Sequence, residues 1–563
     1  MNVLSLVVAN VAVLLGARAV LRRVRTGEAT TDAVLFLLLR LLLISLAMLA
    51  AGVAGGLTSS KLGWAGGAVL AVLLLLGEHR HLPRFRLPRI GRLALVFGGL
   101  IVIRSLLQVW FFAPYQRDAL TYHLPKIGEW IQHGGFTREW GLDLRSTFPS
   151  GFELIETWWV VFLKHDVLIE MAGLEFLALG SVALADLARR LGSSARFACL
   201  AGFLYALTPG VSLQATSCLN DGPVAAIWTA TAALVLRKVP LALTLIPVFL
   251  GIGIKPTYAY ALPGLALLWF LDGKASLRGN RATVLVAVMA VAVGSSWYVR
   301  NAVFYGNPIH PMGRSGIIAH ETHVAQQFGV NWSSLAQNVR RATTSRIYDH
   351  LGPYDPELTM ISGWGLTPFA GGILGLFLLL RTERLLRIVA IGYGVSLLSV
   401  FALVVSDPWF MRYVLFFPGL FALAAAKIAE TRPVFAIVAA AALAFEFVAT
   451  MVPGAFPVEG ATTLASMPWR ERTLYPHVGM EKIDSVGFLE KEDSEAKIYP
   501  VYRPDFSRRV VPLRPDSVEG LGAAMRREGL RYLFCPKGHP FAAEGVRGGL
   551  LKTTPVAGLY ALR

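Results

Sequence analysis

The sequence has few charged residues for its length, and this sets its class. Of its 563 residues, 16% are Asp, Glu, Lys or Arg, whereas 55% are hydrophobic. About a quarter of the residues of a soluble globular protein are charged, so this chain has too few charges to solvate a large surface. The composition therefore excludes a soluble globular protein.

Cysteine is also scarce. Cys199, Cys218 and Cys535 show neither a pairing pattern nor metal-ligand spacing, so we interpret them as small buried residues. The sequence has no Gly-rich phosphate loop, which argues against a nucleotide site. The N-terminal apolar run has no basic residues before it, which favours a retained first span over a cleaved signal peptide.

Positive charge is in excess: the formal net charge of the chain is +17. In a soluble protein this excess would suggest nucleic-acid binding. Here the basic residues cluster between apolar runs, as they do in the cytoplasmic loops of membrane proteins. We therefore expect the lipid bilayer, and no nucleic acid, as a partner.

Apolar runs of about 17 to 25 residues, each long enough to cross a bilayer, recur through roughly the first 450 positions. Basic clusters, among them 22–25, 79–92 and 381–387, set the orientation of these runs. They predict a polytopic α-helical membrane protein of about 14 transmembrane helices with both termini outside. The count requires that residues 148–163 form a re-entrant or interfacial helix.

The chain is organised around one stretch. An apolar run from about residue 93 to residue 112 ends shortly before Asp118, and segment 119–133 has apolar residues at helical spacing on one face. We predict a transmembrane helix, a carboxylate at its exit and then an interfacial helix that lies flat on the membrane. Asp118 either caps that helix or takes part in chemistry, and both interpretations stay open.

Further polar residues are predicted on the same, outer side of the membrane. With Asp118 they are His123, Glu153, Asp221, Lys255, Arg300, His310 and Arg412. Charges at the exit of a span are costly and are functional candidates. Carboxylates and cations on the same side of the membrane suit a reaction in which a hydroxyl is deprotonated and a leaving anion is stabilised. Lys and Arg side chains commonly bind phosphate.

Each of these residues also has a structural interpretation. Lys255 could snorkel to the membrane surface, and Arg300 could bind lipid headgroups. Arg412 could pair with Asp407, and His123 could be an interfacial histidine whose hydrogen bonds are all satisfied. Two more arginines, Arg40 and Arg104, lie inside apolar runs, and we expect them to snorkel or to pair between helices.

The composition changes from about residue 453. Short β-like runs at 497–502, 509–513 and 530–535 alternate with a helical segment at 517–528. This alternation predicts a small soluble α/β domain, residues 453–563, outside the membrane.

Several motifs resemble those of a known family. Residues 118–125 read DALTYHLP and residues 130–134 read WIQHG; Pro149 to Glu153, Thr208-Pro209, Asn220-Asp221, Lys255-Pro256 and Arg412-Tyr413 follow in the expected order. Together they resemble the membrane-embedded GT-C glycosyltransferases, in the group of the protein O-mannosyltransferases and the lipid A aminoarabinose transferase. The resemblance covers about residues 93–452, the catalytic core, and leaves the transmembrane helices of residues 1–92 outside it.

The resemblance implies a GT-C-like fold and an inverting transfer of a sugar from a polyprenyl-phosphate donor to a glycan, lipid or protein acceptor. Asp118 would be the base, and Asp221 a second acidic residue that helps a metal or the acceptor. The other implied roles are donor-phosphate binding by Lys255, Arg412 and Arg300, and acceptor positioning by Tyr122, His123 and Glu153. Many family members have Asp-Glu where this chain has Asp118-Ala119, so a divalent metal stays an open question; no nucleotide cofactor is implied.

The implied location is the bacterial cytoplasmic membrane, with the active site and the C-terminal domain on the extracytoplasmic side. Three alternatives stay open: a lipid-linked glycan transporter or flippase, a ligase that moves whole lipid-linked glycans, and a non-catalytic envelope assembly protein. The broken helix at Lys255-Pro256 is also typical of transporters, whereas the hydropathy pattern has no internal repeat. No motif specifies the sugar, the acceptor or the oligomeric state.

Overall fold

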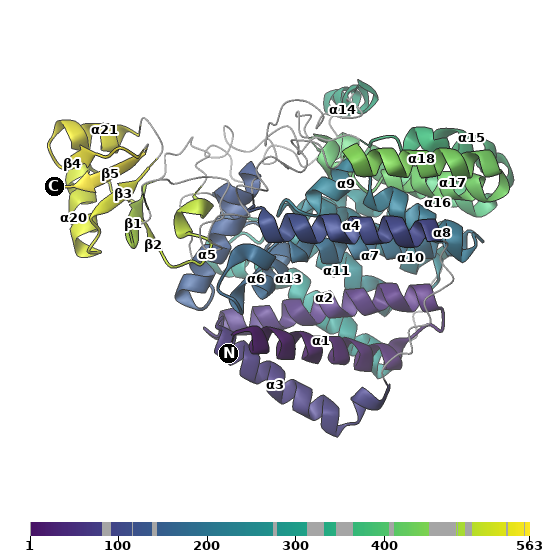
Figure 1. Ribbon diagram of the computed structural model, residues 1–563, viewed down its shortest axis with the longest axis horizontal. Helices are drawn as coiled ribbons and strands as arrows, with labels where there is room; N and C mark the ends of the chain where they lie inside the picture. Colours follow the sequence, from purple (N-terminus) through teal and green to yellow (C-terminus); the bar gives the residue numbers. More distant parts are fainter. Residues whose placement is uncertain are drawn as a thin grey trace.

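The computed structural model is built mainly of helices (Figure 1). It describes residues 2–81, 92–114, 116–137, 144–273, 279–311, 332–344, 364–404, 410–449, 480, 482–489, 498–535, 539–556 and 558–563. Within these residues, five helical segments are long and apolar enough to cross a membrane: Asn2–Val24, Ala29–Val53, Asp166–Arg190, Arg281–Tyr305 and Arg384–Leu403. These segments identify a helical membrane protein, while the count of about 14 spans stays a prediction.

Three helices begin the chain. They are α1 (Asn2–Val24), α2 (Ala29–Val53) and α3 (Ser59–Leu75), and α1 packs against the other two. Arg40 of α2 donates to Glu175 of the later helix α7, with 2.8 Å between Nη2 and Oε1, and to Asn10 of α1 at 3.0 Å. Arg40 is thus paired between helices, which is one of the two outcomes expected for it. The second intramembrane arginine, Arg104, is also buried.

In the described residues, ten helices follow along the chain. They are α4 (Arg92–Phe111), α5 (Leu124–His133), α6 (Gly151–Val161), α7 (Met171–Arg190), α8 (Ala195–Ala206), α9 (Pro209–Gln214), α10 (Asp221–Leu236), α11 (Leu241–Ile254), α12 (Leu262–Leu268) and α13 (Arg281–Tyr305). Helix α10 is buried along nearly its whole length and packs against α7 and α11. Gly253 and Gly294 let α11 and α13 approach closely, since a Cβ on Gly253 would meet the Gly294 Cα at 2.9 Å.

Helix α6 agrees with the expectation for residues 148–163. It has 11 residues, and at about 1.5 Å per residue it is too short to cross a hydrocarbon core of about 30 Å. Its side chains are nevertheless almost all buried, Glu153 and Glu156 among them.

Helix α5 differs from the prediction of an interfacial helix with a water-facing side. Every residue from Leu124 to Trp130 is buried, including Lys126 and Glu129. The physical reason is that α6 packs against α5, and so does the C-terminal segment Tyr499–Tyr502. Gly134, in the left-handed conformation with φ of 69°, ends the helix.

The last helices of the bundle are α14 (Trp332–Thr344), α15 (Ile373–Thr382), α16 (Arg384–Leu403), α17 (Pro418–Thr431) and α18 (Pro433–Ala449). Figure 1 shows α15 to α18 gathered together in green, and α17 packs against α8 of the central group. A short 3-10 helix, Phe410–Val414, lies between α16 and α17 and carries Arg412. Asp407, the partner considered for Arg412, lies outside the described residues.

The described residues of the C-terminal part form a five-stranded sheet with two α-helices. The elements are β1 (Ser485–Phe488), β2 (Arg509–Pro512), α20 (Val518–Arg527), β3 (Tyr532–Phe534), α21 (Pro540–Arg547), β4 (Leu551–Thr553) and β5 (Leu559–Leu562). The strand order is β2-β1-β3-β5-β4; β1 is parallel to β2 and β3, and β5 is antiparallel to β3 and β4. The strands predicted at 509–513 and 530–535 and the helix predicted at 517–528 are confirmed as β2, β3 and α20. Ser517 caps α20 by accepting from the Gly520 N–H at 3.0 Å.

The strand predicted at 497–502 is wrong. Residue 497 lies outside the described residues, and Tyr499–Tyr502 form a turn of 3-10 helix because Pro500 has no N–H for a strand ladder. This segment packs on the helices instead: the Tyr499 hydroxyl donates to the Asp166 carboxylate at 3.2 Å. One face of the sheet, with Val486 and Phe488, shares the apolar core of the helices. The sheet is therefore joined to the bundle at the end where α5 lies (Figure 1).

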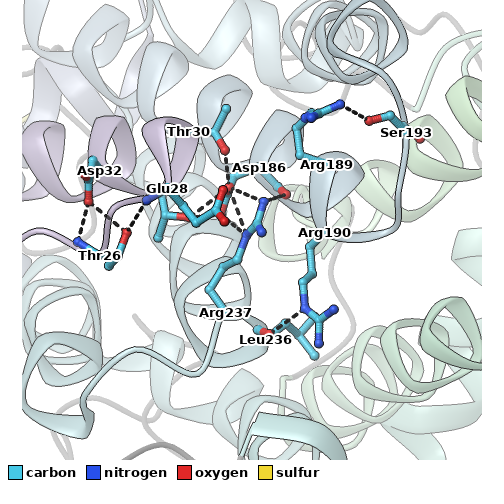
Figure 2. Close-up of polar contacts among 11 residues, drawn as sticks. Thr26, Glu28, Thr30, Asp32, Asp186, Arg189, Arg190, Ser193, Leu236 and Arg237 are labelled. Atoms are coloured by element: carbon cyan, nitrogen blue, oxygen red, sulfur yellow. Dashed lines mark hydrogen bonds and ion pairs between the residues drawn. The ribbon is translucent and has the colours of Figure 1, made fainter.

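A buried carboxylate joins three helices at the far end of α10 from Asp221 (Figure 2). Asp186 of α7 has no exposed surface; it accepts from Thr31 of α2 at 3.0 Å and from Arg237, just after α10, at 2.9 Å. Figure 2 shows Thr30 directed at the same carboxylate. The predicted N-terminal region, residues 1–92, is thereby attached to the central helices. We name the end of α10 with Asp186 and Arg237 the clamp end, and the end with Asp118 and Asp221 the site end.

Candidate functional site

Four charged side chains meet at the site end. Arg412 Nη1 lies 2.7 Å from Asp118 Oδ2, and Arg412 Nε lies 3.5 Å from Asp221 Oδ2. Lys255 Nζ contacts the other oxygen of Asp221. We name Asp118, Arg412, Asp221 and Lys255 the charge quartet. All four were candidate site residues from the sequence, and the structure brings them together across 294 positions of chain.

The local chain explains why these side chains point inward. Asp221 is the first residue of α10, and Lys255 follows α11 in an extended conformation, with φ of −154° and ψ of 128°. Pro256 disfavours a helical conformation for the residue before it, so the helix ends at Lys255, whose N–H makes the last helical hydrogen bond, to the Gly251 carbonyl at 3.0 Å. Asp118 makes no side-chain capping bond. The capping interpretation of Asp118 is therefore not supported, because its carboxylate binds Arg412.

The quartet is electrically balanced, with two carboxylates and two cations. Its side chains are largely buried, with exposed fractions of 17% for Asp118, 11% for Arg412, 15% for Lys255 and 3% for Asp221. Burial by itself would raise the pKa of Asp118, but the Arg412 guanidinium outweighs burial and lowers this pKa to about 2. Asp118 is thus ionised at neutral pH and held as the partner of a cation.

A small recess adjoins the quartet. It is lined by Asp221, Val224, Trp228, Thr257, Tyr258, Ala261, Val400, Arg412, Tyr413 and Phe416. The Tyr413 ring lies under both cations, 4.6 Å from Lys255 Nζ and 5.4 Å from Arg412 Cζ, measured to the ring centroid. The recess thus has aromatic and aliphatic walls and an ionic edge.

A second buried network lies beside the quartet. Glu153 Oε1 of α6 lies 2.8 Å from His123 Nδ1 and 2.6 Å from Lys126 Nζ, and Lys126 also donates to Ser150 Oγ at 2.9 Å. Burial alone would raise the pKa of Glu153, but Lys126 and His123 lower it to about 2. We name His123, Lys126 and Glu153 the Glu153 network. His123 and Glu153 were sequence candidates, whereas Lys126 was missed.

The backbone conformation between Asp118 and His123 brings the charge quartet and the Glu153 network to the same side of this segment. Residues Ala119–His123 form a π-helical turn, so Asp118 and His123, five positions apart, lie about one turn apart. Tyr122 is in the same turn and is buried; its ring lies 4.3 Å from that of His123, and Arg145 Cζ lies 4.5 Å from the Tyr122 ring centroid. Burial raises the pKa of the Tyr122 hydroxyl well above its ordinary value. Tyr122 is therefore a neutral hydroxyl at neutral pH.

Arg300 and His310 occupy a neighbouring region. Arg300, near the end of α13, donates to Asn301 Oδ1 at 3.1 Å and to the Thr137 carbonyl at 3.4 Å. Asn301 in turn donates to the His310 carbonyl at 3.2 Å. These contacts place Arg300 near the end of α5, and its phosphate-binding role stays a prediction.

The structure gives no new evidence on a metal ion. In the described ranges, no three or more His, Cys, Asp or Glu side chains are grouped so that they could hold one. Asp118 and Asp221 each face a cation instead.

No family model matches the chain, and no curated protein matches it.

Proposed function

We propose that the chain is a membrane glycosyltransferase that moves a sugar from a polyprenyl-phosphate donor to an acceptor hydroxyl at the outer face of the bacterial cytoplasmic membrane. One observation carries this proposal. The charge quartet pairs a carboxylate that can accept a proton, Asp118, with two cations that can hold a phosphate, Arg412 and Lys255, beside an apolar recess. A donor of this class needs all three features.

The reaction divides between these groups. In a single displacement, the acceptor oxygen attacks the anomeric carbon while the bond from that carbon to the phosphate oxygen breaks. The acceptor proton passes to the Asp118 carboxylate, and the polyprenyl phosphate leaves with the bonding electrons. Arg412 and Lys255 stabilise the negative charge that develops on the phosphate, and the attack from the opposite side inverts the anomeric centre.

The Glu153 network supports acceptor positioning. Glu153 accepts from Lys126, and this fixes the carboxylate beside His123. The imidazole is then oriented through Nδ1, which leaves Nε2 to contact a hydroxyl. Tyr122, next to it in the π-helical turn, supplies a second neutral group that can donate or accept a hydrogen bond.

The test is donor cleavage by the purified protein with a panel of polyprenyl-phosphate sugars and simple alcohol acceptors. We expect the wild type to cleave one donor and Asp118→Asn to lose at least about a hundredfold in rate, the usual scale for a general base. Asp272→Asn is the matched control, because Asp272 pairs with Arg190 at 3.2 Å near the clamp end and should keep full activity.

Three results would contradict the proposal. Cleavage that Asp118→Asn leaves unchanged would remove Asp118 from the chemistry. Exchange of a labelled lipid-linked glycan across a vesicle membrane, without formation of a glycosidic bond, would establish a flippase. Complementation of a deletion strain by Asp118→Ala would indicate an assembly protein.

A further inference from the structure

The charge quartet has a consequence for ligand binding. Both cations that the proposed function assigns to the donor phosphate already have carboxylate partners. A phosphate that binds Arg412 and Lys255 brings negative charge beside these carboxylates and competes with them for the N–H donors of the two cations. The question is which carboxylate gives way.

The two carboxylates differ in how firmly they are held. Asp221 contacts both cations, its side chain is 3% exposed, and it belongs to the buried helix α10. Asp118 contacts Arg412 alone among the cations of the quartet, its side chain is 17% exposed, and it lies between α4 and the π-helical turn. Release of Asp118 breaks one ion pair, whereas release of Asp221 breaks two.

We propose that Arg412 exchanges partners: an incoming lipid phosphate takes the guanidinium from Asp118, and the freed carboxylate becomes the base for the acceptor. The assignment of Asp118 as the base rests on the proposed function, whereas the exchange itself concerns binding. Arg412 suits this exchange because a planar guanidinium binds carboxylate and phosphate through the same pairs of N–H groups.

The exchange couples donor binding to catalysis. While Arg412 holds Asp118, the pKa of this carboxyl is about 2 and the group is a weak proton acceptor. Loss of the guanidinium removes the largest influence that lowers this pKa, so the carboxylate becomes more basic. The acceptor is thereby deprotonated only after the donor phosphate is in place.

The test measures binding without a sugar. Protein in lipid nanodiscs is titrated with a short-chain polyprenyl phosphate, and the dissociation constants of wild type and variants are compared. We expect Asp118→Asn to bind about tenfold more tightly than the wild type, because the amide competes weakly for Arg412. Arg412→Gln should bind at least about tenfold more weakly, and Arg412→Lys, which keeps the charge and guards against misfolding, should lie between. The control Asp272→Asn should equal the wild type.

The outcomes separate the exchange from the proposed function. An Asp118→Asn affinity equal to or weaker than wild type overturns the exchange, even if sugar transfer is found. Tighter binding by Asp118→Asn, combined with no sugar transfer by the wild type from any donor, supports the exchange and contradicts the glycosyltransferase. No binding of polyprenyl phosphate by the wild type overturns the exchange.

Two further probes identify the source of the phosphate. Inorganic phosphate and phosphatidic acid are titrated into the same proteins. The exchange as proposed requires that polyprenyl phosphate binds more tightly than inorganic phosphate, because the recess beside the quartet has apolar walls. Equal affinity for inorganic phosphate would overturn the lipid part of the proposal, and a preference for phosphatidic acid would reassign it to an ordinary phospholipid.

Discussion

Gly128 lies directly against the ring of Tyr502, 374 positions later in the chain. A Cβ at position 128 would come within 2.9 Å of Tyr502 Cδ1 and Cγ, a distance that side chains do not tolerate. Tyr502 has an exposed fraction of 1%, so its ring has little room to move away. The contact joins the C-terminal part to α5, the helix that carries Lys126.

This contact predicts that Gly128→Ala destabilises the protein by about 1–3 kcal/mol, the usual cost of overpacking a buried position. Thermal unfolding in detergent measures the effect. The double variant Gly128→Ala/Tyr502→Ala should be more stable than the sum of the two single changes implies. Gly99→Ala in α4 is the matched control, because a Cβ there has nothing within 4 Å and should be tolerated. Equal effects at the two glycines would show that Tyr502 does not fill this space.

Substitution of Lys126 is expected to have a second large effect on stability. Lys126→Met should cost about 3–5 kcal/mol, because it leaves the Glu153 carboxylate charged and buried with one partner fewer. The double variant Lys126→Met/Glu153→Gln should recover much of this loss, since no uncompensated charge remains. The exposed Lys61→Met is the control and should be neutral within about 0.5 kcal/mol. If the double variant is as unstable as Lys126→Met, the ion pair is not the cause.

Glu129 predicts a dependence of stability on pH. Burial raises the pKa of its carboxyl from 4.5 to about 8, against smaller opposing effects of Thr137 and Arg300. A raised pKa means that the folded protein holds this proton more tightly than the unfolded chain does. The contribution of Glu129 to stability is therefore complete below about pH 4.5 and is lost as the pH rises through about 8.

Melting temperatures in detergent at about pH 5.5 and about pH 8.5 provide the measurement. Glu129→Gln should reduce the loss of stability between these two values and should be more stable than wild type at the higher one. A wild type and a Glu129→Gln variant with parallel pH profiles would show that Glu129 titrates normally.

Substitution of Asp186 is expected to lower stability without changing the site end. Asp186→Ala should lower stability by about 3–5 kcal/mol, because Arg237 loses its buried partner. The conservative Asp186→Asn should cost less and should leave the affinity for polyprenyl phosphate unchanged, since the clamp end lies at the other end of α10. A change of affinity in Asp186→Asn would show that the two ends are coupled.

The sequence was informative where a charge interrupted an apolar run. Asp118, Asp221, Lys255 and Arg412 could each be selected because a charge at the end of a membrane helix is costly. Their pairing could not be predicted, because the partners are brought together by helix packing and not by sequence spacing. Lys126 was missed for a related reason: on an amphipathic helix a lysine is expected in water, and only the covering segment Tyr499–Tyr502 and α6 bury it.

The strand prediction at 497–502 failed because tertiary packing and Pro500 outweighed a short apolar alternation. Where the local sequence pattern was stronger, it predicted the secondary structure correctly. The helix α20 has a capping serine and a clear apolar face, and its predicted range differs from the observed one by a single residue at each end.

Helix α10 has an ion pair at each end, Lys255 with Asp221 at one and Arg237 with Asp186 at the other, and little of it contacts solvent between them. A helix held in this way keeps its position while its surroundings change. Entry and departure of a bulky lipid ligand then depend on the short irregular segments at its rim, around Lys255 and Arg412. On the proposed function, α10 would thus be the fixed support of the site, and the segments at its rim would be the part that admits the donor.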